Sequence, residues 1–235
     1  MSEQGPEQVP DQGPEQLPGG RHGLSREEVL RSQRERLLDA TVQSAVERGF
    51  QAMTVADVIR RAGVSRRTFY EMFADKEEAF LSAYDAVIDI LVHEVESAYR
   101  EQTGTWPRRV RAGVQAMADL LAANAAVAHM AMVEATAASQ VARQRYRDAL
   151  TRFTPFLDEG RGVSEFAGRL PANTSRIAIG SVAALLFDEV RGGRAEQLSD
   201  LVPDLLFAVV LPFLGREVAV AERQATIAAA AGSTT

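Results

Sequence analysis

The feature that most constrains the fold is a pair of short helical segments around one glycine, in residues 54–73 (TVADVIRRAGVSRRTFYEMF). Thr54 and Asp57 match the capping-box pattern that begins helices, and apolar residues follow them at helical spacing. Gly63 supplies the positive φ that a tight turn needs, and Ser65 is a second helix-capping residue. Two short helices joined by a glycine-containing turn indicate a helix-turn-helix.

The rest of the chain from Ser25 onward is also helical by its pattern. No stretch shows a convincing period of two, so the protein is predicted to be all-α, with about nine helices. Gly49 is expected to stop the first helix, and residues 160–171 are expected to form a loop. The expected helices are 25–48, 54–62, 65–73, 75–101, 108–122, 125–138, 139–158 with a kink near Pro155, 173–191 and 199–215.

Composition divides the chain into segments. Residues 1–23 repeat a Gly-Pro-Glu-Gln motif and hold four of the nine prolines. They bury too little apolar surface to become ordered, so they are predicted to be a disordered acidic tail. A helix-turn-helix domain is predicted over 24–78, and a larger helical effector-binding and dimerisation domain over 79–216. The alanine-rich residues 217–235 are predicted to be a flexible tail.

Bulk composition also limits the function classes. The chain has no cysteine, which excludes disulfides and thiolate chemistry and suits a reducing cytoplasm. A net charge of −6 argues against a non-specific nucleic-acid binder, but it allows a small DNA-binding module on an acidic body. No secretory signal is visible, and the charge-poor runs 177–187 and 205–215 are shorter than the ~20 residues of a membrane span. A cytoplasmic protein without membrane contact is expected.

The first turn of the predicted third helix is suited to DNA. Arg66 and Arg67 lie on this turn, where their side chains reach base edges or phosphates, because an α-helix fits the major groove of B-DNA. Thr68 adds a hydroxyl, and Tyr70 adds a phenol on another face. Each feature alone is more typical of an ordinary solvated helix. The order of cap, apolar face, glycine turn and basic aromatic helix favours DNA binding.

Residues 34–80 resemble the N-terminal domain of the TetR family of transcriptional regulators (RERLLDATVQSAVERGFQAMTVADVIRRAGVSRRTFYEMFADKEEAF). The resemblance covers about a fifth of the chain. It implies a homodimeric all-helical repressor of a palindromic DNA operator, with the dimer interface and a ligand cavity in the C-terminal domain. Arg66 and Arg67 are expected to read bases, and Thr54, Tyr70 and Lys76 to bind phosphates. The full set of DNA-contacting positions implied is Thr54, Ser65, Arg66, Arg67, Thr68, Tyr70 and Lys76.

Residues 205–211 (LLFAVVL) carry the dimer prediction, because a helix that is apolar on every side must be buried on every side. One subunit would struggle to cover it, so helices 173–191 and 199–215 are expected to pack on their copies in a four-helix bundle. A dimer would place two recognition helices ~34 Å apart, in successive grooves. The interface residues expected are Ile177, Gly180, Ala184, Phe207, Val210 and Leu214.

The middle helices are expected to enclose the effector cavity, because ligand pockets are mostly apolar with a few polar groups. For any single residue there, ordinary core packing is the alternative. No nucleophile–base pattern or phosphate-binding glycine loop is present, so no catalytic site or cofactor is predicted, and His93, Glu96 and His129 do not predict a metal site. The cavity residues expected are Trp106, Met117, Leu121, Met130, Glu134, Tyr146 and Phe153.

The predicted function is a DNA-binding regulator, most simply a repressor released from its operator by a small apolar or amphipathic effector. The helix 75–101 is expected to transmit the change between the two domains. One alternative is an architectural DNA-binding protein without an effector, which would have a filled C-terminal core. Another is a helical enzyme or adaptor whose N-terminal helices serve a different purpose.

Overall fold

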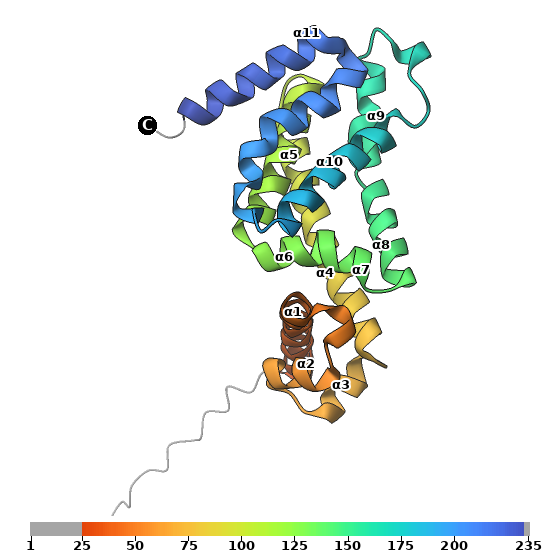
Figure 1. Cartoon of the computed structure of the whole chain (residues 1–235), viewed down its shortest axis with the longest axis vertical. Helices are drawn as coiled ribbons and strands as arrows, with labels where there is room; N and C mark the ends of the chain where they lie inside the picture. The colour runs from red at the N-terminus through yellow and green to blue at the C-terminus, as the bar shows by residue number, and fades with distance from the viewer. Residues whose placement is uncertain (1–24, 233–235) are drawn as a thin grey trace, which may run out of the picture.

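The computed structural model describes residues 25–232, which are helical over nearly their whole length and contain no strand (Figure 1). In chain order, the elements are α1 (Arg26–Ala52), α2 (Val55–Ala62), α3 (Arg66–Met72), α4 (Lys76–Glu101), α5 (Trp106–Ala123), α6 (Ala125–His129), the π-helix η1 (Met130–Glu134), α7 (Ala135–Ala137), α8 (Gln140–Thr151), α9 (Thr154–Gly162), the 3-10 helix η2 (Ala167–Arg169), α10 (Thr174–Arg191), the 3-10 helix η3 (Ala195–Leu201) and α11 (Val202–Gly232). The all-α prediction is confirmed. The tail predicted for residues 1–23 lies outside the described residues.

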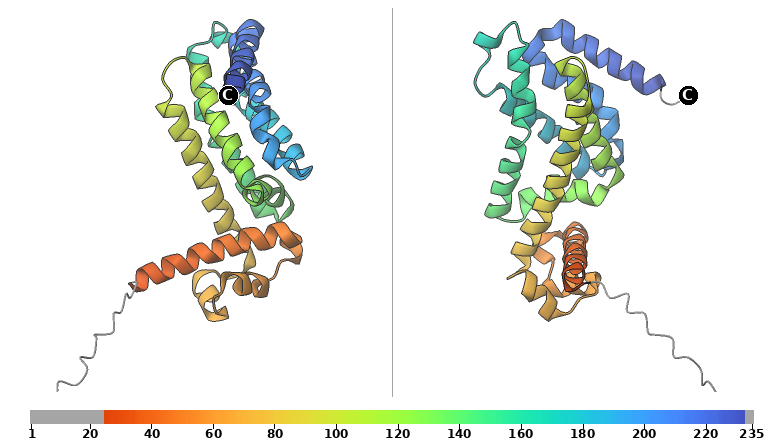
Figure 2. Two further views of the ribbon diagram at one scale, coloured as in Figure 1. Left: turned by 90° about the vertical axis from the view of Figure 1, so that its left-hand side faces the viewer. Right: turned by 180° about the vertical axis from the view of Figure 1, so that it is seen from behind.

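The chain forms a small head and a larger body. The head consists of α1, α2 and α3, and the body consists of α4 to α11 (Figure 1). α1 lies across the lower end of α4, and α4 then continues upward beside α5 as the central helix of the body (Figure 2). α8 and α9 cover one side of this pair, and α10 and α11 cover another. A single helix therefore connects the head to the interior of the body.

The boundaries of the head helices follow their capping residues. The side chain of Glu28 accepts a hydrogen bond from the Ser25 backbone N–H at 2.6 Å, which completes the capping box of α1. Gly49 leaves the helical path with a φ of 73°, as predicted, and one short turn follows it up to Ala52. Large apolar side chains fill the space between the three helices, and the fully or almost fully buried ones include Leu37, Val58, Phe69 and Phe73.

Lys76 fastens the end of α1 to the start of α4. Its ammonium group donates hydrogen bonds to the carbonyls of Phe50, Gln51 and Met53, each at 3.0 Å. The same nitrogen lies 4.8 Å from the centre of the Phe50 ring. These carbonyls need an outside donor, because the last carbonyls of a helix have no partner within it.

Two of the expected body helices are divided in the structure. The predicted helix 125–138 contains the π turn η1 in its middle, so it forms α6, η1 and α7. The predicted helix 139–158 ends at Thr151, and α9 starts at Thr154. Pro155 explains this second break, because it has no N–H to donate to the carbonyl of Thr151. The two helices α8 and α9 therefore replace one kinked helix.

The C-terminal segment differs from its prediction as a flexible tail. The expected stop at Gly215 is present, with a φ of 81°, but residues 216–232 then form a second helical arm (Figure 1). Arg223 joins this arm to the first half of α11 through Asp204, at 2.6 Å, and Ala219 and Thr226 are buried. The run of alanines favours a helix in its own right, and the buried residues attach that helix to the body.

By length and apolar composition alone, Ala195–Gly232 would suit a membrane span, because it contains an 18-residue window with a mean hydropathy of 1.7. The sequence did not predict a segment of this length, because its charge-poor runs, 177–187 and 205–215, are each too short to span a membrane. In the structure the segment bends at Gly215, and Leu205, Leu206 and Phe213 pack in the interior of the body. The apolar character of α11 is thus used, at least in its first half, for the core of the body.

Replacing Lys76 with methionine, which keeps an unbranched apolar side chain but removes the ammonium group, is expected to destabilise the head. Three carbonyls would lose a charged donor, and hydrogen bonds to charged groups contribute ~1.5–3 kcal/mol, so a loss on the order of 2 kcal/mol is expected. Urea denaturation followed by circular dichroism measures it. The control is Arg108→Met at an exposed position of α5, and equal stability of the two variants would contradict the capping role.

Candidate functional site

The helix-turn-helix is built by two caps and one glycine. Thr54 and Asp57 form a complete capping box at the start of α2, in which the Asp57 N–H donates to the Thr54 hydroxyl oxygen at 3.2 Å. Gly63 ends α2 in the left-handed conformation, with a φ of 63°. The Ser65 hydroxyl oxygen then accepts from the Thr68 N–H at 3.0 Å and begins α3. The turn predicted from the sequence is therefore present.

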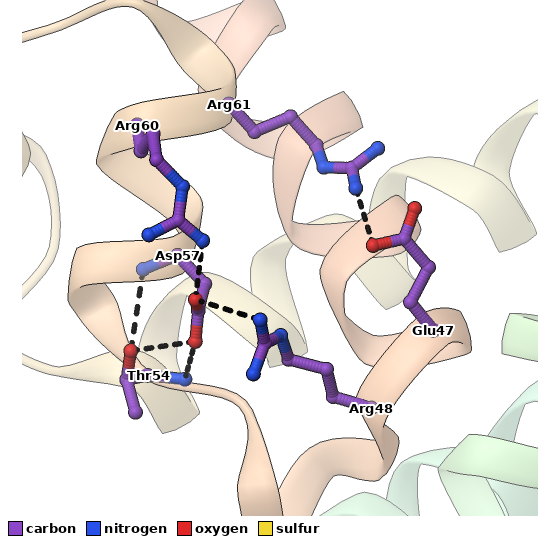
Figure 3. A network of polar contacts seen from close by, with 6 residues as sticks. All are labelled: Glu47, Arg48, Thr54, Asp57, Arg60 and Arg61. Atoms are coloured by element: carbon purple, nitrogen blue, oxygen red, sulfur yellow. Dashed lines mark hydrogen bonds and ion pairs between the residues drawn. The ribbon is translucent and has the colours of Figure 1, made fainter.

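Asp57 organises the polar contacts between α1 and α2 (Figure 3). Its carboxylate accepts from the Thr54 hydroxyl at 2.6 Å and from Arg60 at 2.6 Å, and Arg48 lies 3.5 Å away. These contacts, led by the Thr54 hydrogen bond, lower the pKa of Asp57 to about 2. An ion pair between Arg61 and Glu47 lies beside them. The network fixes the start and end of α2 against α1.

The outer face of α3 carries the side chains predicted to meet DNA. Arg66 and Arg67 are exposed on its first turn, while Phe69 points inward and is fully buried. Arg66 lies over the ring of Tyr70, 5.5 Å from its centre, and Arg67 pairs with Glu71 at 2.8 Å. Exposed pairs of this kind contribute little to stability, so both guanidinium groups can exchange partners at low cost.

Two of the predicted phosphate ligands are engaged elsewhere. The Thr54 hydroxyl donates to Asp57, and the three protons of the Lys76 ammonium meet three backbone carbonyls. Binding of phosphate by either group would require these internal bonds to be exchanged. Ser65 and Thr68 share a hydroxyl–hydroxyl hydrogen bond at 2.8 Å beside the arginines. The DNA-contacting set stays a prediction, with Arg66, Arg67 and Tyr70 as its most accessible members.

The body encloses an apolar cavity of about 90 Å³. Helices α4, α5, α8, α9, α10 and α11 and the π-helix η1 all contribute to its lining. Met117, Tyr146 and Phe153 line it, as predicted from the sequence. The α4 lining was not predicted, although its spacing marks one continuous helix face. These α4 residues are Tyr84, Ile88, Leu91, Val95 and Tyr99.

The other four residues predicted for the cavity lie outside its lining. The Trp106 indole N–H donates to the carbonyl of Phe156 at 2.9 Å, and its ring packs on Phe213. Leu121 and Met130 are fully buried in the packed core. These three residues do not line this cavity, because apolar periodicity does not distinguish a residue that fills a core from one that faces a void.

Glu134 is the fourth such residue, and it lies at the junction of head and body. Its carboxylate accepts a hydrogen bond from the backbone N–H of Phe50 at 2.9 Å. Close by, the side-chain amide of Gln51 donates to the carbonyl of Ala138 at 2.7 Å. Ala131 and Met132 of the same π-helix line the cavity. η1 therefore contacts both the cavity and the head.

An apolar face is exposed on α10 and continues onto α11. Ile177 is 65% exposed, and Gly180 and Ala184 follow it at helical spacing. Phe207 and Leu214 are partly buried on α11. Val210 is fully buried in its own protomer, so its assignment to the interface is wrong. A stretch that is apolar all round does not reveal which of its sides faces the chain's own core.

An exposed basic helix, set on a glycine turn below a larger helical body, is the arrangement found in helix-turn-helix DNA-binding proteins. Residues 37–83 match the model of a protein family described as bacterial regulatory proteins, tetR family. This match covers α1 from Leu37 onward, α2, α3 and the start of α4. Relatives and solved structures agree with it, so the head is similar to the DNA-binding domain of the TetR family.

Among curated proteins, the transcriptional activator FasR of Mycolicibacterium smegmatis is 35% identical over 105 residues. That match covers 44% of this chain and 46% of FasR, so the chain spans less than half of that relative's length. The fatty acid degradation regulator FadR of Bacillus halodurans superposes with a TM-score of 0.68 at 21% identity, over 76% of this chain and 94% of FadR. FadR of Bacillus subtilis, solved with stearoyl-CoA, gives 0.64 at 20% identity, over 75% and 97%. These structures share the fold.

The stabilising effect of Asp57 is expected to depend on pH. Its carboxyl has a pKa of about 2 in the folded protein and ~3.9 when unfolded, so its contribution is complete above pH ~4 and is lost as the pH falls toward 2. Urea midpoints of the wild type and Asp57→Asn should therefore differ at pH 6, and the difference should shrink below pH ~4 and disappear as the pH falls to about 2 and below. A difference that does not change with pH would contradict this assignment.

Proposed function

We propose that the protein is a ligand-responsive regulator that binds a palindromic operator as a homodimer and is released by an apolar effector. The observation that carries the DNA-binding part is the exposure of Arg66 and Arg67 on the capped first turn of α3. Arginine side chains on such a turn bind guanine O6 and N7 in the major groove. Tyr70 is 47% exposed on the same helix and is suited to a phosphate.

The double variant Arg66→Ala with Arg67→Ala tests this proposal. Each bidentate contact with a base contributes ~1–3 kcal/mol, so affinity for the DNA upstream of the protein's own gene should fall at least about 30-fold. Fluorescence anisotropy over a salt series measures it, and the salt dependence should also become less steep. Arg108→Ala with Arg143→Ala removes the same charge from the body and is the matched control. Wild-type affinity in the first variant would rule out α3 as the reading helix.

The cavity supports a chain-like apolar effector. Its α4 lining runs from Tyr84 to Tyr99, which corresponds to about 22 Å at ~1.5 Å per residue. One acyl chain in a bilayer leaflet occupies ~15 Å, half of the hydrocarbon thickness, so a long acyl chain fits this length. The stearoyl-CoA complex of the Bacillus subtilis FadR supports the same class of ligand. An architectural protein would have a filled core, so the void among these residues favours the effector-binding alternative.

The size of the cavity indicates how the effector would act. A volume of about 90 Å³ is well below the ~300 Å³ or more of ordinary ligand pockets, so a long chain can enter only if the lining moves apart. The effector would therefore bind better to an expanded body than to this one. Such differential affinity is what shifts a conformational equilibrium.

The shift would reach the head through two elements that contact both sites. α4 lines the cavity and is tied to the head by Lys76, and η1 lines it through Ala131 and Met132 and holds the Phe50 N–H through Glu134. Displacement of either element changes the orientation of the head. In a dimer, a small rotation of each head changes the spacing of the two recognition helices.

The dimer would form through the exposed apolar face of α10 and α11. Ile177→Glu places a charge in the middle of this face and is expected to convert the dimer into monomers, as measured by sedimentation equilibrium. Val141→Glu is the matched control, because Val141 is a 49% exposed apolar residue on a different helix, α8. If the wild type sediments as a monomer at micromolar concentration, the dimer proposal fails. If Val141→Glu also dissociates the dimer, the interface is not confined to the face of α10 and α11.

A further inference from the structure

We infer that Tyr84 is a ligand-binding residue of the cavity that determines specificity, by donating a hydrogen bond from its hydroxyl to the carbonyl or carboxylate oxygen of an acyl ligand. This inference rests on the effector cavity of the proposed function and adds the polar contact that it lacks. The ligand it selects is a long chain that carries an acyl oxygen at one end. A pure hydrocarbon chain would not satisfy the site.

The hydroxyl of Tyr84 is buried and has no hydrogen-bond partner among residues 25–232. The residue is 1% exposed and lines the cavity from α4. Buried polar atoms are almost always paired, because the loss of hydration is otherwise uncompensated. A buried donor that lines the cavity and has no partner within residues 25–232 therefore indicates a partner that enters with the ligand.

A second tyrosine on the same helix face provides an internal comparison. Tyr99 also lines the cavity, but its hydroxyl donates to the Glu159 carboxylate at 2.8 Å. The cavity thus has a satisfied tyrosine at one end of its α4 lining and an unsatisfied one at the other. The other lining residues are aliphatic or aromatic, with Tyr146 as the one additional side chain that carries a hydroxyl. The polar end of a ligand therefore belongs at the Tyr84 end.

The surroundings of Tyr84 keep its hydroxyl in the donor form. Burial, followed by the neighbouring Tyr146 and Asp85, raises the pKa of Tyr84 well above its usual value of 10.0. At neutral pH the group therefore carries its proton. A protonated phenol in an apolar wall can donate to an acyl oxygen.

The contact between α4 and α8 next to Tyr84 carries two arginines and is therefore suited to an anionic group. Arg145 pairs with Asp85 there, and Arg152 pairs with Asp89 at 2.7 Å, so two ion pairs join these helices at the surface. Exposed pairs are weak and exchange readily. A carboxylate, or the phosphates of an acyl thioester, could replace Asp85 or Asp89 as the partner of these arginines while the chain occupies the cavity.

The experiment measures binding by the full chain without DNA, by isothermal titration calorimetry. The probes are hexadecanoate, hexadecanoyl-coenzyme A and the S-hexadecyl thioether of coenzyme A, which lacks the carbonyl. Tyr84→Phe is expected to bind the favoured acyl probe about tenfold more weakly than wild type and to bind the thioether unchanged. Preference of the wild type for the acid or for the thioester identifies which acyl oxygen is recognised.

Tyr99→Phe is the control, and its effect should not depend on whether the probe has a carbonyl. The melting temperature of ligand-free Tyr84→Phe should not fall, since the variant removes an unpaired hydroxyl. If Tyr84→Phe binds the acyl probes as wild type does, or loses the thioether equally, the inference is overturned. If wild type binds none of the three probes, the acyl assignment fails, while operator binding through Arg66 and Arg67 is tested separately.

Discussion

The arrangement of head and body depends on how the backbone around Phe50 is satisfied. Gly49 interrupts α1, and polar groups of the next residues lose their helical partners. Lys76, from the start of α4, takes three of the carbonyls, and Glu134, from the π-helix, takes the Phe50 N–H. One short turn is therefore held from two sides, by the helix that enters the body and by the element that lines the cavity.

This junction connects the two candidate sites through short and specific contacts. The cavity and the recognition helix lie in different parts of the molecule, and packing alone would couple them only loosely. α4 and η1 each present one set of residues to the cavity and another to the turn at Phe50. Under the proposed function the small cavity favours coupling, because a ligand that pushed its walls apart would also move the elements that hold the head.

The head could be predicted closely from the sequence because its signals are local. The caps at Ser25, Thr54 and Ser65 and the glycine stops act on neighbouring backbone groups, and all of them appear as expected. The body was harder, since its outcome depends on distant partners. Apolar spacing did not show that Val210 faces inward, and a lysine at a helix start did not show which carbonyls it would meet.

Trp106 gives the molecule a built-in optical reporter. It is the chain's single tryptophan, it is 2% exposed, and it lies in the body with Phe213 against its ring. Its indole N–H bonds to the carbonyl of Phe156, whose side chain lines the cavity. Tryptophan emission, excited at the red edge of protein absorption, therefore comes from the body, and the helices of the head do not contribute to it. It can follow changes at the cavity, while a label on the DNA follows binding to an operator.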